Sequence, residues 1–491
     1  MGNRLGIVGI LFLIIFIMAC NEVVPEPFVP NLQANTQKFD FDSTGGDRVL
    51  IIASNTNWTI MHDAGWCRPS IGADSGDVTL YINADPNDST FVRNTIFKLM
   101  AEGVDDLEIS IEQTGKAEVI VEDPVVPVED PEMRNLTSLE VSKLMGVGWN
   151  LGNSLEAISA NNGNYSGGET TWGNPKVSQL LIDSIKAAGF NAIRIPVSWS
   201  HKIVDQYSYE INEAWLERVA EVVNYVLDNQ MYAIINIHWD GGWMDHPDNA
   251  HQNEINEKLE ALWSQIAAHF VNYNDHLLFA GSNEVHMENN WGTPTTENVN
   301  VQNSFNQTFV DAVRATGGRN ALRHLVVQGY VTNIDNTLKY FKVPIDPAEN
   351  RLMVEVHFYD PYDFTLQEGS GYKTQWGKPF AGGNVSTWGQ ESWVNDVFGK
   401  MKTKFVNNGM PVILGEYGAM LRSSLTTGLD KHVEARNYYI EYVTKAAVDN
   451  GMVPFYWDNG HTGNNGFGLF NRSTGKQVYP ETIRAIVKAV E

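Results

Sequence analysis

The feature that most constrains the fold is an alternation over residues 138–491 between short apolar runs and longer amphipathic stretches. The amphipathic stretches, such as 178–189, 214–229 and 434–451, have the apolar spacing of helices. Short apolar runs between helices are typical of strands buried on both faces of a parallel sheet. The runs cover residues 145–150, 192–197, 232–238, 277–284, 325–329, 352–358, 412–416 and 453–457.

Eight strand-and-helix units in roughly 350 residues predict an α/β fold, a closed (β/α)8 TIM barrel with loop insertions, over residues 138–491. A doubly wound open sheet is the alternative arrangement of the same elements. No glycine-rich phosphate loop follows the first apolar run, which counts against the nucleotide-binding form of that alternative.

The residues before the barrel have a different hydrophobic pattern. Residues 31–116 contain alternating segments separated by turn residues, which predict a small all-β, immunoglobulin-like sandwich of about seven antiparallel strands. Residues 117–137 contain the sequence VEDP twice and three prolines, so we expect a semi-rigid linker between the two domains.

Residues 1–20 are predicted to be an export signal. Arg4 is their only charge, and the apolar run Ile7–Ala19 is shorter than the roughly 20 residues that span a bilayer. The run ends at Cys20 in a sequence that resembles a bacterial lipobox, so we expect a lipid on Cys20; an ordinary cleaved signal is the alternative. We therefore expect an exported lipoprotein on the outer membrane or cell surface of a Gram-negative bacterium, with Cys67 as the remaining cysteine.

The charge balance limits the partners. The chain has 59 acidic residues and only 34 lysines and arginines, which gives a net charge of −25. Nucleic acid is therefore an unsuitable partner, because it is itself negatively charged. A lipid anchor would be the only membrane contact, and we expect a monomer without cofactor or metal.

Polar residues stand at the carboxyl ends of nearly all the predicted barrel strands, where active sites of (β/α)8 barrels lie. Core packing needs apolar residues at these positions, so the set indicates a functional site. Its members are Asn150, Asn153, Arg194, His238, Asn283, Glu284, His357, Tyr359, Glu416 and Trp457.

Two of these residues, Glu284 and Glu416, are carboxylates that follow the fourth and seventh strands. Glycoside hydrolysis needs two facing carboxyl groups, and a separation of about 5 Å gives retention of configuration. We expect Arg194 and Tyr359 to keep Glu416 ionised as the nucleophile. Glu284 would then carry the proton, with a raised pKa, as the acid/base.

The chain resembles glycoside hydrolase family 5 over residues 145–490, and subfamily 4 in particular through GWNLGNSLEA and TTWGNP. The other motifs that carry the resemblance are AAGFNAIRIPVSW, INIHWDGGW, SNEVH, VHFYDP, LGEYGAM and FYWDNG. The resemblance implies an endo-acting enzyme on β-1,4-glucans, with xyloglucan as the expected polysaccharide substrate and cellulose or mixed-linkage glucan as the alternative.

The resemblance also implies residue roles. Glu284 would be the acid/base and Glu416 the nucleophile, Asn283 would bind the 2-hydroxyl of the sugar at the cleaved bond, and Trp457 would lie beneath that sugar. Arg194, His238, His357 and Tyr359 would form the surrounding polar shell. The chain departs from the usual family pattern at Val285, where proline is usual, and at Trp239, where a second histidine is frequent, which leaves the shape of the sugar subsites open.

Residues 31–116 are similar to the BACON module of bacterial surface enzymes, through GWC at 65–67, the strand around Arg93 and IEQTG at 111–115. The family name implies carbohydrate binding; a spacer between membrane and enzyme is the simpler interpretation.

Two other functions remain open. The first is a metal-dependent hydrolase built on His238, Asp240, Asp245, His246 and His251, although their spacing matches no helical ligand pair. The second is a non-catalytic glycan-binding lipoprotein. Five loop tryptophans could stack on outer sugar units or simply pack, namely Trp172, Trp243, Trp291, Trp376 and Trp388.

Overall fold

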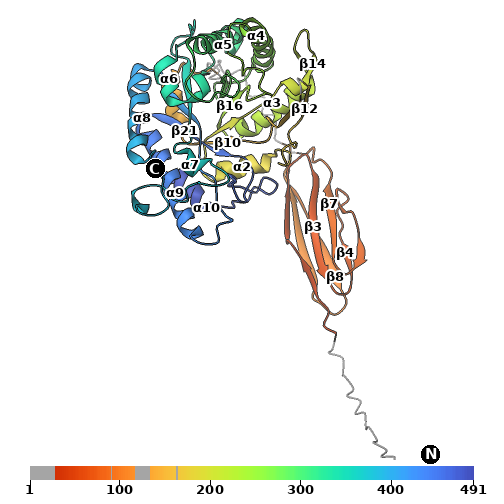
Figure 1. Cartoon of the computed structure of the whole chain (residues 1–491). Coiled ribbons are helices and arrows are strands. Elements are labelled where there is room, and N and C mark those ends of the chain that lie inside the picture. Colours follow the sequence, from red (N-terminus) through yellow and green to blue (C-terminus); the bar gives the residue numbers. More distant parts are fainter. Residues whose placement is uncertain (1–27, 90, 117–132, 162–163, 491) are drawn as a thin grey trace, which may run out of the picture. The chain divides into compact units, whose positions relative to one another are not determined.

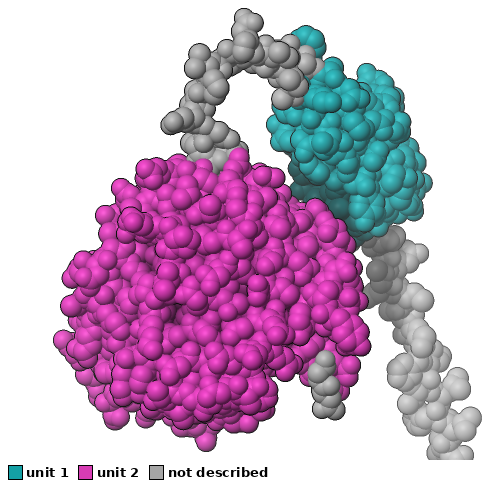
Figure 2. Space-filling view, turned by 90° about the horizontal axis from the view of Figure 1, so that it is seen from above, with its two compact units in different colours: residues 1–126 teal, residues 127–491 magenta. Residues whose placement is uncertain are grey.

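The computed structural model describes residues 28–89, 91–116, 133–161 and 164–490, which fall into two compact units, Met1–Val126 and Pro127–Glu491 (Figures 1 and 2). The division between the units lies inside the predicted linker, whose residues 117–132 are outside the described part of the chain. The predicted signal and Cys20 also lie outside it.

The first unit is a β-sandwich, as predicted. One sheet has the order β1-β3-β7-β5 and the other the order β2-β9-β8-β4-β6. The nine strands are β1 (Leu32–Ala34), β2 (Lys38–Phe41), β3 (Gly46–Ser54), β4 (Asn57–Met61), β5 (Cys67–Pro69), β6 (Ala73–Ser75), β7 (Val78–Ala84), β8 (Arg93–Ala101) and β9 (Leu107–Gln113).

The sandwich differs from the prediction in two details. It has nine strands rather than about seven, because the three-residue strands β1, β5 and β6 are too short to show an alternating pattern. One pair, β2 with β9, is parallel rather than antiparallel. The core between the sheets includes Leu50, Trp58 and Cys67, and burial raises the pKa of the Cys67 thiol to about 11, so this cysteine is a packing residue.

The second unit is the predicted barrel (Figure 1). Its strands pair in parallel in chain order, and β10 also pairs with β21, which closes the barrel and excludes the open-sheet alternative. The strands are β10 (Gly148–Leu151), β13 (Ala192–Ile195), β16 (Tyr232–Asn236), β17 (Leu277–Ala280), β18 (Leu325–Gln328), β19 (Leu352–Phe358), β20 (Val412–Tyr417) and β21 (Met452–Asp458).

Helices surround the barrel, and each strand is followed by one of them. After α1 (Ser138–Leu144), the successive outer helices are α2 (Gln179–Ala187), α3 (Glu213–Asp228), α4 (Gln252–His269), α5 (Thr296–Ala315), α6 (Ile334–Tyr340), α8 (Glu391–Lys404), α9 (Leu429–Asp449) and α10 (Pro480–Lys488).

Shorter elements lie in the loops. They are the hairpins β11 (Ile158–Asn161) with β12 (Asn164–Gly167) and β14 (Ile203–Asp205) with β15 (Glu210–Ile211), helix α7 (Tyr362–Thr365), and the 3-10 turns η2 (Ser200–Lys202), η3 (Gly318–Ala321), η4 (Tyr330–Thr332), η5 (Lys378–Phe380) and η6 (Val406–Asn408). Within the described residues, no helix is both long and apolar enough to cross a membrane.

The interior of the barrel is apolar at one end and polar at the other. Helix α1 begins at Thr137 in a capping box with Glu140, and its Val141 packs with inward-facing residues such as Ile234 and Leu278. Because side chains alternate along a strand, the inward positions two residues further on form the next layer. That layer is polar, and it forms the floor of the site.

Candidate active site

A buried arginine organises the polar end of the barrel. Arg194, in β13, has no exposed surface, and its guanidinium contacts four side chains on four other strands or their following loops. Nη1 donates to Asn150 Oδ1 and to Glu416 Oε1, both at 3.0 Å, and Nη2 donates to Asn283 Oδ1 at 2.7 Å. Nε lies 2.8 Å from Glu355 Oε1 in an ion pair. Arg194 therefore fixes the relative positions of these strand ends.

Glu355 is a part of this site that the sequence analysis missed. It lies in the middle of β19, fully buried, and accepts a hydrogen bond from Gln328 Nε2 at 2.7 Å. Burial alone would raise its pKa, but the charge of Arg194 and a hydrogen bond from His357 lower that pKa to about 2. A charged residue inside an apolar strand, two positions before His357 and so on the same face, was the signal available in the sequence.

Glu416 reaches the barrel mouth through an irregularity in β20. Val356 of β19 pairs with Leu414, but the next residue, His357, pairs with Glu416, so Gly415 is an extra residue in β20. Strict alternation from inward-facing Ile413 would place Glu416 on the outer face; the bulge turns it to the same face as His357. Gly415 is required there because a Cβ would lie 1.9 Å from Glu355 Oε1.

Glu284 faces Glu416 across the barrel mouth. One carboxylate oxygen of each glutamate and a ring nitrogen of His357 all lie within 4.8 Å of one another. His357 Nδ1 is 2.6 Å from Glu284 Oε1 and 3.7 Å from Glu416 Oε2, and its Nε2 is 3.3 Å from Glu355 Oε1. Tyr359 donates its hydroxyl hydrogen to Glu416 Oε2 at 3.1 Å.

His357 is the second cation of this cluster. Burial alone would lower the pKa of His357, but Glu416 and the hydrogen bonds to Glu284 and Glu355 raise it to about 9, so the ring is a cation at neutral pH. Arg194 and His357 then face three carboxyl groups, those of Glu284, Glu355 and Glu416.

The environment of Glu416 contains opposing effects. Burial, the largest effect, raises its pKa, the charges of His357 and Arg194 lower it, and the nearby Glu284 carboxylate raises it. The net pKa of Glu416 lies above its usual value because burial outweighs the two cations, contrary to the expectation from the sequence. Glu416 also accepts hydrogen bonds from Arg194 and Tyr359. Burial and the charge of Glu416 hold the pKa of Tyr359 well above its usual value, so its hydroxyl keeps its proton and serves as a donor.

A cavity of about 680 Å³ opens above these groups. His238, Asn283 and Trp457 line it together with both glutamates. Two tryptophans form further walls, Trp291 from the loop after β17 and Trp393 from the first turn of α8. The His238 and Trp457 rings are nearly parallel, 5.9 Å apart. Burial holds the pKa of His238 well below its usual value, so this ring is neutral. The cavity is thus lined by four carboxyl groups, those of Glu284, Glu416, Asp335 and Asp360, by the two histidines and by aromatic faces.

Two of the three predicted asparagines, Asn150 and Asn153, have different positions. Asn150 is fully buried beneath the cavity, where its amide donates to Gly415 O at 2.8 Å and its oxygen accepts from Arg194. Asn153 is in the loop after β10, with a positive φ of 59°, and its backbone bonds to Glu156 and Asn174. Asn153 is not among the described residues that line the cavity.

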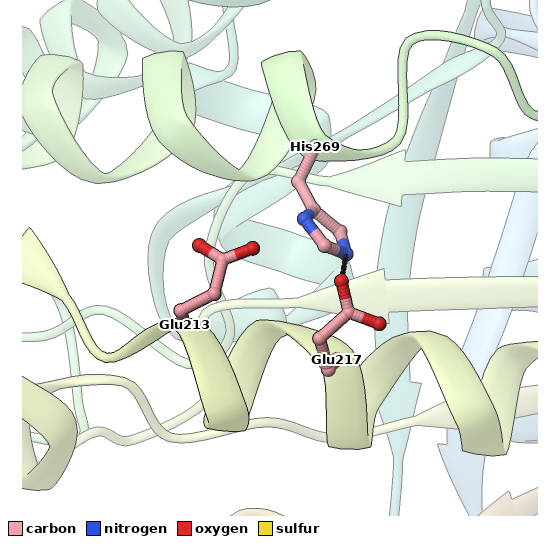
Figure 3. Close-up of side chains that lie close together, drawn as sticks. All are labelled: Glu213, Glu217 and His269. Atoms are coloured by element: carbon pink, nitrogen blue, oxygen red, sulfur yellow. Dashed lines mark ion pairs between the residues drawn. The ribbon is translucent and has the colours of Figure 1, made fainter.

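The proposed metal ligands of the alternative hydrolase are engaged in other contacts. Asp240 accepts hydrogen bonds from the backbone of Trp199 and Ser200 and from the Trp243 indole. Among the described residues, two groups have the geometry to hold a metal ion, and neither is that set: one is Glu284, His357 and Glu416. The other is Glu213, Glu217 and His269, on the outer helices α3 and α4 (Figure 3).

The loop tryptophans divide between packing and the cavity. Trp376 is fully buried, and Trp243 lies 4.3 Å from the ammonium of Lys258. Trp172 donates to Ile158 O, and Trp388 packs edge-on against Trp393. Of the five, Trp291 lines the described cavity.

Comparisons with known proteins agree with this geometry. A family model described as Cellulase (glycosyl hydrolase family 5) matches residues 156–463. The xyloglucan-specific endo-β-1,4-glucanase of Bacteroides ovatus is 41% identical over 496 residues, covering 99% of this chain and 98% of that protein.

Solved structures are similar as well. The Bacteroides ovatus family 5 xyloglucanase in complex with a XXXG heptasaccharide matches with a TM-score of 0.71 and 42% identity, over 94% of this chain and 100% of that one. A broad-specificity endoglucanase from Bacteroides salanitronis matches with a TM-score of 0.67 and 40% identity, over 75% of this chain and 98% of that one.

Replacing Glu355 by glutamine should destabilise the protein by about 3 kcal/mol at pH 7, because the folded pKa of about 2 lies below the unfolded value of 4.5. The ionised Glu355 carboxylate stabilises the folded protein above about pH 4.5, and this stabilisation is lost as the pH falls toward 2. The difference in unfolding free energy between wild type and Glu355→Gln should therefore shrink between pH 5 and pH 3, measured by urea unfolding.

The exposed Glu441 of α9 provides the matched control, since Glu441→Gln should change the unfolding free energy little at either pH. A Glu355→Gln penalty that stays the same at pH 3 as at pH 7 would contradict the assignment of the low pKa to this carboxyl group.

Proposed function

The chain belongs to glycoside hydrolase family 5, and from that premise we propose that it is a retaining endo-β-1,4-glucanase that acts on xyloglucan. The observation that carries the mechanism is the pair of facing carboxyl groups of Glu284 and Glu416, with oxygens within 4.8 Å. A separation of about 5 Å is typical of retaining enzymes, whereas inverting enzymes need roughly 6.5–9.5 Å to admit a water molecule.

In the proposed cycle Glu416 attacks the anomeric carbon and forms a glycosyl ester. Glu284 gives its proton to the departing glycosidic oxygen as the bond to the anomeric carbon breaks. The Glu284 carboxylate then takes a proton from water, whose oxygen attacks the anomeric carbon and releases Glu416. The enzyme returns to its starting protonation state, and the net reaction adds one water molecule across one linkage.

The neighbouring groups support this division of roles. Glu416 accepts hydrogen bonds from Arg194 and Tyr359, and both donors favour its carboxylate. Glu284 accepts from His357 through Oε1 and has a side chain that is 26% exposed against 7% for Glu416, so its other oxygen is the more accessible proton carrier. Asn283, held by Arg194, lines the cavity beside Glu284 and would bind the sugar hydroxyl next to the cleaved bond.

The substrate is proposed from the similarity to the Bacteroides ovatus enzyme, which extends over both units of the chain. A wide cavity of about 680 Å³ with aromatic walls suits a branched polymer. Cellulose or mixed-linkage glucan is the alternative, favoured by the likeness to an endoglucanase of broad specificity. A non-catalytic glycan-binding protein is less compatible with two facing carboxyl groups that are held by Arg194, His357 and Tyr359.

The remaining proposals concern location. The lipobox-like sequence that ends at Cys20 supports an exported, lipid-anchored protein at the outer membrane. We propose the β-sandwich as a spacer and residues 117–137 as the linker, so that the catalytic barrel acts on polysaccharide outside the cell.

Replacing Glu416 by glutamine should lower kcat on soluble xyloglucan at least about a thousand-fold, because an amide is not a nucleophile for this reaction. Glu284→Gln should lower it by about 100- to 10,000-fold on the polymer. Glu284→Gln should lower kcat much less with a dinitrophenyl glycoside, because the leaving group of that substrate needs no proton. Both variants should keep the wild-type circular dichroism spectrum.

The control for these two variants is Glu260→Gln, which makes the same change on the exposed face of α4 and should retain full activity. Near-normal turnover by Glu416→Gln would contradict the proposed nucleophile.

A panel of xyloglucan, mixed-linkage β-glucan, carboxymethyl cellulose and mannan should give the highest kcat/KM on xyloglucan. Product sizing over time should show an early fall in polymer length, since an endo-acting enzyme cuts internal linkages. Equal or higher kcat/KM on the unbranched glucans would favour the alternative substrate, and no cleavage of any polymer would favour a binding protein.

Cells that express the full chain and are grown with a radiolabelled fatty acid should yield a labelled, membrane-associated protein. The variant Cys20→Ala should be unlabelled and released in soluble form, whereas Cys67→Ala should remain labelled, because Cys67 is buried inside the sandwich. An unlabelled wild-type protein would contradict the anchor.

A further inference from the structure

Asn236 is a buried polar residue of the site that has no role in the cycle above. It is the last residue of β16, has no exposed surface, and stands two positions before His238, which lines the cavity. A buried carboxamide needs hydrogen-bond partners for its oxygen and its NH2 group, because unpaired polar groups are costly in the core. The partners of Asn236 therefore show what this side chain does.

The orientation of the Asn236 carboxamide is fixed by the loop after β13. The backbone N–H of Val197 donates to Asn236 Oδ1 at 3.1 Å, and the Val197 carbonyl oxygen accepts from the backbone N–H of His238 at 2.9 Å. A backbone nitrogen can only donate, so the atom that it meets is the amide oxygen, and the NH2 group lies on the other side. The Trp199 indole donates to the Asn236 carbonyl oxygen at 3.0 Å, which holds the backbone as well.

The NH2 group of Asn236 faces the ring of His238. Its Nδ2 lies 3.2 Å from His238 Nδ1. Because an amide nitrogen carries two hydrogens and accepts none, Nδ1 has to accept this hydrogen bond with its lone pair. A neutral imidazole has one N–H group and one acceptor nitrogen, so the ring hydrogen is on Nε2. His238 therefore offers a donor at Nε2 to a substrate in the cavity that it lines.

The charges around His238 favour the same neutral ring. Burial, and then the positive charges of Arg194 in β13 and His357 in β19, hold the pKa of His238 well below its usual value. Glu284 and Glu416 line the same cavity, but the ring that they contact is that of His357. Both nitrogens of His357 face carboxylates, so that ring keeps two hydrogens. The two histidines thus differ in protonation because their partners differ.

We propose that Asn236 is a positioning residue that fixes His238 as the tautomer with its hydrogen on Nε2, so that the ring donates a hydrogen bond to a hydroxyl group of the bound sugar. The inference rests on the proposed hydrolase function and deepens it. In the other tautomer the Nδ1–H group and the Asn236 NH2 group would meet hydrogen to hydrogen, and Nε2 would become an acceptor. Asn236 acts on the substrate only through His238.

The test is Asn236→Asp, which keeps the size of the side chain and an acceptor for the Val197 N–H but replaces the NH2 group by a second oxygen. That oxygen accepts from His238 Nδ1–H, and its charge raises the pKa of the ring. Below the raised pKa the ring carries both hydrogens and keeps its donor at Nε2. Above it the neutral ring keeps its hydrogen on Nδ1, and the donor at Nε2 is lost.

The activity of Asn236→Asp relative to wild type should therefore fall as the pH rises. The loss of kcat/KM on xyloglucan should be less than about threefold near about pH 5 and about tenfold or more near about pH 8, because one hydrogen bond to the sugar is lost only at the higher pH. An equal loss at both pH values would overturn the proposal, since a merely structural defect does not follow the titration of His238.

A ring spectrum tests the tautomer without substrate and without a variant of Asn236. In the full chain with ¹⁵N-labelled histidine rings, His238 Nδ1 should have the chemical shift of an unprotonated nitrogen and Nε2 that of an N–H group at about pH 7. The two resonances are identified by their absence in His238→Gln. A wild-type ring with its hydrogen on Nδ1 would overturn the proposal. In Asn236→Asp, Nδ1 should be protonated.

The matched control is Asn253→Asp, which makes the same change at an exposed position of α4. It should leave kcat/KM and the ring spectrum of His238 unchanged, and thermal melting should show that all variants are folded. Failure of the proposed function is distinguishable, since the wild-type protein would then cleave no polymer while its ring spectrum would still report the tautomer of His238.

Discussion

The buried guanidinium of Arg194 is the interaction on which the rest of the site depends. A charge without exposed surface must be matched by hydrogen bonds and opposite charges, since an unpaired ion in the core would cost several kcal/mol. Glu355 and Glu416 supply the charges, and Asn150 and Asn283 supply neutral acceptors. Each partner comes from a different strand or from the loop that follows it. Pairing all of them with the Arg194 guanidinium therefore aligns the strand ends at the polar end of the barrel.

The same cation, together with His357, sets the electrostatics of catalysis. Two positive groups lie beside three carboxyl groups, and Glu355 is the carboxylate that does not react in the proposed cycle. Its role is to balance the charges of Arg194 and His357, with which it forms ion pairs.

Specificity is located elsewhere, in the loops above this layer. The residues that surround Arg194 sit on barrel strands and are buried, whereas Trp291 and Trp393 lie in a loop and at a helix start and line the cavity. Rigid strands thus position the reacting groups, and exposed aromatic side chains face the polymer. This separation is consistent with the similar proteins, one of which is a xyloglucan-specific endo-β-1,4-glucanase and another an endoglucanase of broad specificity.

The barrel, the sandwich and the pair of glutamates at the strand ends could all be predicted from the amino-acid sequence. Apolar runs that alternate with amphipathic stretches report burial directly, and polar residues at strand ends have no packing explanation, so Glu284, Glu416 and their neighbours were predictable. Three features needed the tertiary structure. Glu355 was missed because a single charged residue within a strand does not show which residue it pairs with. Asn153 follows the end of a strand, but its backbone is hydrogen-bonded within its own loop.

The third feature is the bulge at Gly415, which alone turns Glu416 toward the cleft; a period-two pattern places it on the opposite face. The hydrophobic periodicity of a strand or helix depends on neighbouring residues and can be read from the sequence. Strand register and contacts between distant segments are fixed only when the barrel closes.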